Sequence, residues 1–168
     1  PEVSIGPLGD YAGFGGRAMT SAIVSKEVPP LCHPLGAANK LVIAPGLLSG
    51  SNAAMSGRIS VGCKSPLTGG IKEANAGGRT ANEMAALGIK ALIIEGIPDG
   101  PDWNLLYLNK DGVRFEDGRA YAGLGVYQSA GEIIARYGED IALSLIGPGG
   151  EMALKAAGIQ NIDKDLVP

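Results

Sequence analysis

The sequence is poor in the residues that build the commonest metal sites. Its 168 residues include one histidine, His33, and two cysteines, Cys32 and Cys63. A zinc site built on histidines is therefore nearly excluded. The cysteines lack C-x-x-C spacing, so we expect two ordinary thiols rather than a disulfide or a metal pair. An iron–sulfur cluster needs several thiolates close together, and these two do not provide that set.

Charge and long apolar runs are scarce too. Charged residues make up 18% of the chain, and the net charge is −3. Lysines and arginines form no cluster, which argues against a nucleic-acid-binding surface. No signal peptide is present, and no apolar run reaches the ~18 residues of a membrane helix. We expect a cytoplasmic protein without a membrane span. Because the first residue is Pro1 rather than methionine, we also expect a chain that was processed or cut from something longer.

Glycine is the abundant residue. The chain contains 27 glycines, more than twice the usual share of ~7%. They follow no Gly-x-y period, which excludes collagen, and many stand in pairs between apolar runs. This arrangement is typical of a turn-rich sheet protein or of a ligand site lined by backbone.

Residues 58–83 concentrate these features in the stretch RISVGCKSPLTGGIKEANAGGRTANE. An apolar run is followed by a glycine turn, a short strand, a second glycine turn at Gly77 and Gly78, and a helix start. Glycine lets backbone N–H groups come close to a ligand, and a helix N-terminus suits a phosphate. Arg58, Lys64 and Arg79 add positive charge. The stretch is a candidate cradle for an anionic, flat or extended cofactor.

The pattern predicts an α+β fold, a β-sheet domain with short helices in one domain over residues 1–168. Thr80 with Glu83, and Ser129 with Glu132, have the spacing of capping boxes. We expect strands at 40–44, 58–63, 71–74, 91–94 and 141–146, a hairpin of 104–109 with 112–115, and helices at 18–27, 80–87, 129–137 and 151–157.

Two similar segments suggest that the domain consists of two similar halves made by internal duplication. Gly15-Gly16-Arg17 precedes a helix and a strand that begins at Lys40, and Gly77-Gly78-Arg79 precedes a helix and a strand that begins near Lys90. We expect the two glycine turns to face the same groove. Gly147-Pro-Gly-Gly150 imitates a dinucleotide-binding turn, but Met152 stands where the third glycine is needed, so a structural turn is the better interpretation.

The stretch GRISVGCKSPLTGGIKEANAGG resembles the N-terminal domain of the tungsten-containing aldehyde ferredoxin oxidoreductase family. The resemblance covers residues from about 12 to 161. It continues in GFGGRAMTSAI, NKLVIAPGLLSG, ALGIKALIIEGIP and IALSLIGPGGEMALKAA. The K-S-P-L-T-G run is its most specific part.

The resemblance implies the site residues. Arg58, Asn75 and Gly77 match family positions that touch the pterin parts of a bis-pterin tungsten cofactor (tungstopterin, or molybdopterin if molybdenum replaces tungsten). Ala76 and Gly78 are their backbone neighbours. The family also has a Mg²⁺ ion that bridges the two pterin phosphates and is reached by a backbone oxygen at the position of Asn75.

Other basic residues have two interpretations. Arg17 and the glycines before it either start a helix or also stabilise the cofactor region. For Lys64 and Ser65, which carry the family signature beside Pro66, we expect a structural role.

The resemblance further implies an enzyme that oxidises aldehydes to carboxylic acids, with ferredoxin as electron acceptor and a homo-oligomeric state. Family chains are several times longer, and their [4Fe–4S] cysteines and substrate residues lie downstream. This chain alone is then an inactive fragment, with no catalytic residue of its own, that meets the remaining domains. Two alternatives stay open. One is a non-catalytic scaffold or subunit, and the other is a family member with a different substrate, such as a ring-reducing subunit.

Overall fold

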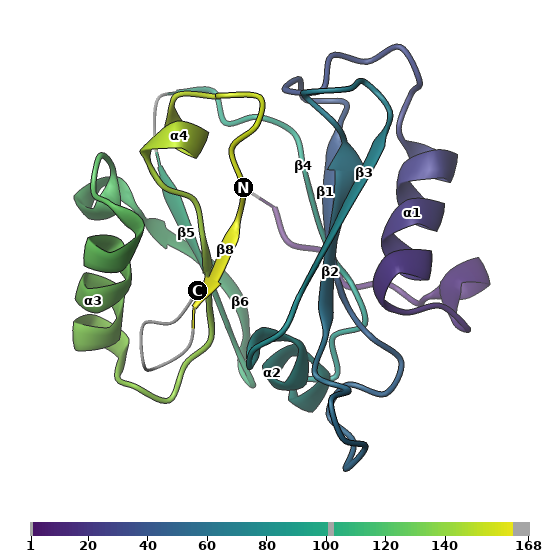
Figure 1. The fold of residues 1–168 in the computed structure, drawn as a ribbon, viewed down its shortest axis with the longest axis horizontal. Helices are drawn as coiled ribbons and strands as arrows, with labels where there is room; N and C mark the ends of the chain where they lie inside the picture. The colour runs from purple at the N-terminus through teal and green to yellow at the C-terminus, as the bar shows by residue number, and fades with distance from the viewer. Residues whose placement is uncertain (1, 101–102, 163–168) are drawn as a thin grey trace.

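An antiparallel four-stranded sheet organises the first part of the chain (Figure 1). The computed structural model describes residues 2–100 and 103–162. The strand order is β3-β2-β1-β4. The strands are β1 (Lys40–Pro45), β2 (Ile59–Lys64), β3 (Ile71–Ala76) and β4 (Leu92–Glu95). The four strands expected from the sequence are confirmed to within one or two residues at their ends.

Two helices cover opposite faces of this sheet (Figure 1). Side chains alternate between the faces of a strand, so each strand supplies both layers. On one face Met19 and Ile23 of α1 (Gly16–Glu27) pack with Val42 of β1. On the other face Met84 of α2 (Thr80–Ala86) packs with Ile59 of β2. The sheet is thus buried on both sides at its centre.

Gly62 of β2 allows α1 to lie close to the sheet. A Cβ atom at this position would come within 2.6 Å of the Cβ of Thr20 on α1. That distance is shorter than any real contact, so a side chain at residue 62 would push the helix away. The close approach fixes the height of α1 above β2 and β3.

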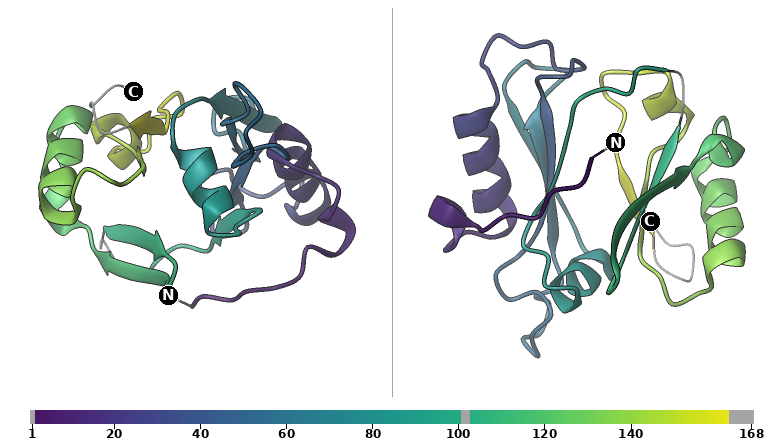
Figure 2. Two further views of the ribbon diagram at one scale, coloured as in Figure 1. Left: turned by 90° about the horizontal axis from the view of Figure 1, so that it is seen from below. Right: turned by 180° about the vertical axis from the view of Figure 1, so that it is seen from behind.

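The elements after β4 form smaller units on the side of the sheet opposite α1 (Figure 2). A hairpin pairs β5 (Asn104–Asn109) with β6 (Gly112–Asp117), as expected. The helix α3 (Val126–Tyr137) packs on this hairpin, and the ring of Tyr137 stacks on that of Tyr107 with centroids 5.2 Å apart. The remaining elements on this side are a pair formed by β7 (Leu143–Leu145) and β8 (Gln160–Ile162), the short α4 (Pro148–Glu151) and a 3₁₀ turn at Arg119–Tyr121. A second 3₁₀ turn, Gly9–Tyr11, lies beside α1 instead.

The mixed α+β class with antiparallel sheets is therefore confirmed. The first Gly-Gly-Arg segment opens α1 and leads to β1, whereas the second precedes α2 and leads to β4. β1 and β4 are antiparallel neighbours in one sheet, and α1 and α2 lie on opposite faces. The duplication itself stays a prediction. No helix in the described part of the chain is both long and apolar enough to cross a membrane.

Both predicted capping boxes are wrong. α2 begins after Arg79, whose side chain makes no capping hydrogen bond, and Glu83 accepts a hydrogen bond from the Arg79 guanidinium at 3.0 Å. α3 begins at Val126, a full turn earlier than expected, so Ser129 lies within the helix. At α2 the Glu83 carboxylate binds the Arg79 guanidinium, and at α3 the helix starts earlier. Each removes the geometry that a capping box needs.

The last expected helix, at residues 151–157, is also wrong. α4 covers Pro148–Glu151, because proline is well suited to the first turn of a helix and starts it early. Ala153 then has a φ of 55°, in the left-handed region, which ends the helix. The turn at residues 147–150 stands beside an antiparallel strand pair, in keeping with a structural rather than a dinucleotide-binding role.

Lys64 is a buried lysine that joins the β2 end to the connector after α1. Its residue is 9% exposed. Its ammonium group donates hydrogen bonds to the carbonyl oxygens of Pro30 and Cys32, the latter at 2.8 Å. The side chain of Asn39 accepts from the Lys64 N–H at 3.0 Å. The structural role expected for Lys64 is what these contacts describe.

Replacing Lys64 by methionine should destabilise the fold. Methionine keeps most of the volume but leaves two carbonyl oxygens without a donor, which costs about 1–3 kcal/mol. We expect urea unfolding to show a lower free energy of unfolding for Lys64→Met. Lys110→Met, an exposed lysine in the hairpin turn, is the control and should unfold as the parent does. Equal stability of the two variants would contradict the structural role of Lys64.

Candidate cofactor-binding site

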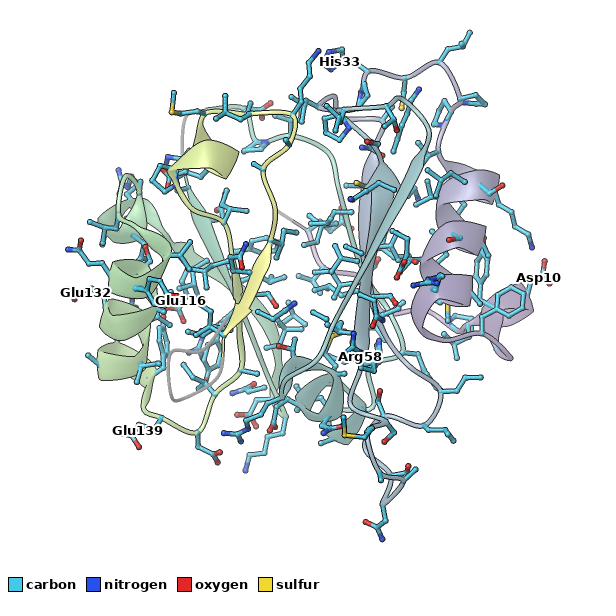
Figure 3. The ribbon with its side chains drawn as sticks, viewed as in Figure 1. Asp10, His33, Arg58, Glu116, Glu132 and Glu139 are labelled. Carbon is cyan, nitrogen blue, oxygen red and sulfur yellow. The ribbon has the colours of Figure 1, made fainter. Side chains whose placement is uncertain are left out.

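Arg58 and Asn75 come together at the end of two neighbouring strands. Arg58 directly precedes β2, and Asn75 lies on β3 opposite Ser60. The Nε atom of Arg58 donates a hydrogen bond to the Oδ1 atom of Asn75 at 2.7 Å. Figure 3 shows Arg58 at the end of the sheet near α2. The register of the β2–β3 pair therefore brings together two residues that are 17 positions apart in the sequence.

The side-chain amide of Asn75 is held from both ends. While Oδ1 accepts from Arg58, Nδ2 donates to the Ile59 carbonyl oxygen and to the Ser60 hydroxyl, each at 3.1 Å. The Nε edge of the Arg58 guanidinium is thus fixed against the sheet. Within residues 2–100 and 103–162, its Nη1 and Nη2 groups have no hydrogen-bond partner, and the residue is exposed. These donors are available to an anion.

The backbone carbonyl of Asn75 points to an open edge of the sheet. Strand residues direct their backbone groups alternately to the two sides. The Arg58 carbonyl oxygen accepts from the Gly46 N–H, so the backbone groups of Arg58 face β1. By alternation, the backbone N–H and C=O of Ile59 face β3, and those of Ser60 face β1. Asn75, the partner of Ser60, therefore turns its carbonyl oxygen away from β2. β3 is an edge strand, so that oxygen faces no strand of this sheet.

Gly77 keeps the space beside Arg58 free of side-chain atoms. A Cβ atom there would lie 3.2 Å from Nη1 of Arg58, a tight contact. Gly78 follows with a φ of 92°, which an L side chain rarely adopts, and it faces open space. Ala76, in contrast, packs against the core on the α2 face. The structure thus brings Arg58 into hydrogen-bond contact with Asn75 and places Gly77 close to the Arg58 guanidinium, with Ala76 and Gly78 next to these residues in the chain.

Two further residues belong to this region and were not singled out from the sequence. Ser60 accepts from Asn75, and its hydroxyl lies 3.5 Å from where a Cβ of Gly16 would stand. Glu73 pairs with Arg17, with Nε and Oε2 2.8 Å apart. Both glycine turns therefore meet the same hydrogen-bond network. The position of Glu73 two residues before Asn75 in a strand was the available signal, since such residues share a face.

The other basic residues of the glycine-rich stretch lie elsewhere. Arg79 pairs with Glu83 at 3.0 Å and with Asp140 at 2.6 Å. The hydrogen bonds to Asp140 and Glu83 raise the pKa of Arg79 further, so it stays charged.

Ser65 lies at the far end of β2, where its hydroxyl accepts from the Leu67 and Thr68 N–H groups and shapes the turn. These contacts fit the structural role expected for Ser65.

The two cysteines are free thiols in this structure. Burial raises the pKa of Cys63, which favours the neutral thiol over the thiolate that binds metals. In the described part of the chain, no three or more histidine, cysteine, aspartate or glutamate side chains are grouped as they would be around a metal ion.

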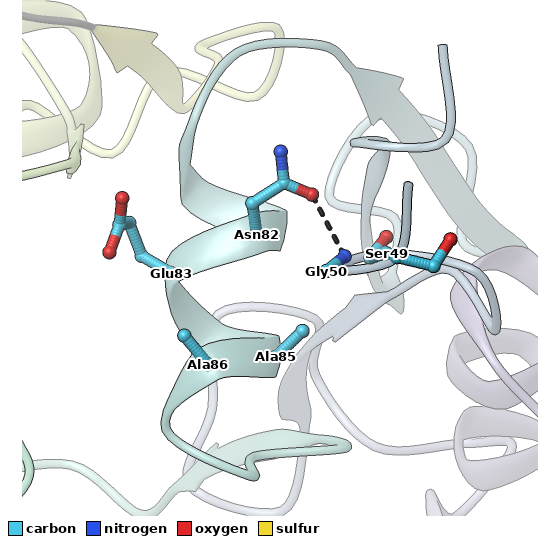
Figure 4. A pocket seen from close by; sticks show the side chains of 7 residues that line it. Ser49, Gly50, Asn82, Glu83, Ala85 and Ala86 are labelled. Carbon is cyan, nitrogen blue, oxygen red and sulfur yellow. Dashed lines mark hydrogen bonds between the residues drawn. The ribbon is translucent and has the colours of Figure 1, made fainter. Parts of the chain in front are cut away.

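A separate hollow of about 410 Å³ lies between α2 and the loop after β1 (Figure 4). Asn82 spans it, with Oδ1 accepting from the Gly50 N–H at 3.0 Å. None of the predicted site residues lines this hollow. Its lining residues are Ser49, Gly50, Ser51, Asn82, Glu83, Ala85 and Ala86.

Comparison with known proteins shows the family of this chain. Residues 3–166 match the family described as aldehyde ferredoxin oxidoreductase, N-terminal domain. The fold and this match define an oxidoreductase domain of mixed α+β architecture. The chain belongs to the aldehyde ferredoxin oxidoreductase N-terminal domain family.

Similar proteins are much longer than this chain. It is 36% identical to a tungsten-containing aldehyde ferredoxin oxidoreductase of Thermococcus kodakarensis and 35% identical to one of Pyrococcus furiosus. Each match covers 88% of this chain and 24% of the relative, so the chain spans about a quarter of their length.

A solved structure is similar as well. It is the active-site complex BamBC of benzoyl coenzyme A reductase in complex with 1,5-dienoyl-CoA, with a TM-score of 0.84 and 30% identity. The match covers 95% of this chain and 24% of that one.

Removing the amide of Asn75 should release the Arg58 side chain. In Asn75→Ala the Arg58 Nε–H loses its acceptor and should exchange with water faster, which side-chain nitrogen NMR measures directly. Arg114, whose Nε is bound to Glu116 at 2.7 Å, is the internal reference and should be unaffected. Unchanged exchange at Arg58 would show that Asn75 does not hold it in solution.

Proposed function

We propose that this chain is the cofactor-seating domain of a tungsten or molybdenum bis-pterin oxidoreductase that oxidises aldehydes to carboxylic acids with ferredoxin as electron acceptor. The observation that supports this most is the hydrogen bond between Arg58 and Asn75 with Gly77 close to Arg58, because these three positions resemble the family's pterin-binding residues. Family membership and the tungsten-containing relatives add to it.

The donor set suits the phosphates of such a cofactor. Arg58 offers its terminal N–H groups in a fork that matches two phosphate oxygens. Gly77 leaves room for the ligand beside this fork. The outward carbonyl oxygen of Asn75 is a hard oxygen ligand of the kind that Mg²⁺ accepts together with phosphates. We therefore propose Asn75 as the backbone ligand of a Mg²⁺ ion that bridges the two phosphates, with Ala76 and Gly78 as neighbouring contacts.

In this proposal the chain binds and orients, and it carries out no chemical step. The tungsten–pterin group, when bound, supplies the two-electron chemistry. Arg58 balances phosphate charge, and Asn75 keeps the guanidinium at a fixed position on the sheet. The [4Fe–4S] cluster, the residues that handle the aldehyde and the ferredoxin contact are assigned to the remaining domains of a longer, homo-oligomeric cytoplasmic enzyme.

A second candidate is ring reduction rather than aldehyde oxidation. The similarity to the BamBC complex of benzoyl coenzyme A reductase favours it, because that similarity covers 95% of this chain. The residues around Arg58 and Asn75 serve a cofactor in either case and do not separate the substrates. A non-catalytic subunit that keeps the fold is the remaining alternative, and metal content separates it from both enzymes.

Elemental analysis of the protein from its native host tests the proposal. About one tungsten or molybdenum per polypeptide, with iron present, is the expected result for a bis-pterin enzyme with a cluster. A native protein without tungsten, molybdenum or iron would leave the scaffold as the surviving candidate. Turnover of an aldehyde with reduction of ferredoxin then separates aldehyde oxidation from ring reduction.

Replacing Arg58 by alanine in the whole protein should lower the metal content several-fold while circular dichroism stays unchanged, because the side chain is exposed and makes no core contact. Lys72→Ala is the matched control. It removes one positive charge from the neighbouring strand β3, at a position on the face of the sheet opposite Asn75. Equal metal content in the parent and Arg58→Ala would contradict the role of Arg58.

A further inference from the structure

Two arginines lie next to each other along β3, each held by a side chain of that strand. Arg58 is bound by Asn75, and Arg17 is bound by Glu73. Glu73 and Asn75 are two residues apart, so they share one face and stand ~7 Å from each other along the strand. The two guanidinium groups therefore flank one short row of side chains on the α1 face.

The two arginines use the same edge of their guanidinium groups. In both the Nε atom donates to the strand, at 2.8 Å for Arg17 and 2.7 Å for Arg58. Across residues 2–100 and 103–162, the terminal nitrogens of Arg17 also have no hydrogen-bond or ion-pair partner. The Arg17 side chain is 72% exposed, whereas that of Glu73 is 13% exposed. Arg17 thus covers the carboxylate and presents its free donors outward.

The backbone keeps Arg17 in this position. It lies in the first turn of α1, where Gly16 is buried against Ser60 and Gly46. One turn later, Thr20 packs against Gly62 and accounts for the close approach of the helix to the sheet. The start of α1 is therefore fixed against β2, directly beside the strand that carries Asn75.

We propose that Arg17 is a second anion contact of the site, positioned by Glu73, and that it binds a phosphate of the same cofactor as Arg58. This inference rests on the proposed function for the identity of the ligand. A cofactor with two phosphates carries more negative charge than Arg58 alone balances. Two guanidinium groups held by side chains of one strand offer two pairs of terminal N–H groups of the kind that binds phosphate oxygens.

A purely stabilising role accounts poorly for this pair. Ion pairs with an exposed partner contribute little to stability. The second carboxylate oxygen of Glu73, Oε1, is buried and has no hydrogen-bond partner within the described residues, which is unfavourable. A carboxylate that fixes Arg17 while leaving its terminal N–H groups free is better explained by a ligand for those groups.

The test uses the whole protein freed of cofactor, with inorganic pyrophosphate as the probe in titration calorimetry. Arg17→Ala should weaken pyrophosphate binding about tenfold, the effect of losing one charge-assisted contact. Glu73→Gln keeps an oxygen for the Nε of Arg17 but removes a negative charge, so it should strengthen binding. Lys26→Ala is the control, because Lys26 lies on the same helix but pairs with Asp10 instead.

The opposite signs separate an anion contact from a structural pair. If Arg17 and Glu73 only stabilise the fold, both substitutions should lower the unfolding temperature. The affinity for pyrophosphate should then not fall in Arg17→Ala and rise in Glu73→Gln. Such a result overturns the inference. An equal loss of affinity in Arg17→Ala and Lys26→Ala also overturns it, because the effect would then be one of net charge.

Metal content separates this inference from the proposed function. We expect Arg17→Ala and Arg58→Ala each to lower tungsten or molybdenum per polypeptide, with Lys26→Ala at the parent level. A loss in Arg58→Ala with the parent content in Arg17→Ala overturns the role of Arg17 and leaves the proposed function standing. A parent protein without either metal, purified from its native host, overturns both.

Discussion

The geometry of the candidate site depends on the hydrogen bonds of the Asn75 side-chain amide. Among the described residues, this amide is the only group that hydrogen-bonds to Arg58, to the Ile59 carbonyl oxygen and to the Ser60 hydroxyl together. An asparagine can do this because its amide accepts at one end and donates twice at the other. An aspartate in its place would lack the donors, and a shorter side chain would not span the strands. The position of the guanidinium thus follows from strand register, which the whole sheet determines.

Small residues are the second constraint. The close approach of α1 to the sheet needs the absence of a side chain at Gly62, and the space beside Arg58 needs the same at Gly77. Gly62 is therefore required by packing, and Gly77 leaves space in the candidate site. Lys64 shows the complementary case, in which a long side chain is buried because its ammonium group donates to two backbone carbonyl oxygens in place of water.

The sequence predicts local elements here better than it predicts how they begin and end. Apolar runs and glycine turns located the strands and the hairpin, because these signals are local. Capping boxes failed at Thr80 and Ser129, because Arg79 competes for Glu83 in one case and α3 starts earlier in the other. Arg58 and Asn75 were found through a resemblance. Their contact depends on hairpin register, and the pair of Arg17 with Glu73, 56 residues apart, depends on where α1 docks.

The location of the site on an edge strand has a consequence for solubility. A strand with unpaired backbone groups is a template on which another chain can add a strand and begin to aggregate. β3 has only six residues, and adjacent charges of opposite sign, Lys72 and Glu73, project from its two faces. A strand that paired along this edge would place its side chains beside both charges, which disfavours pairing with an apolar strand. The charged residues next to Asn75 thus also protect the edge that the backbone carbonyl of Asn75 leaves open.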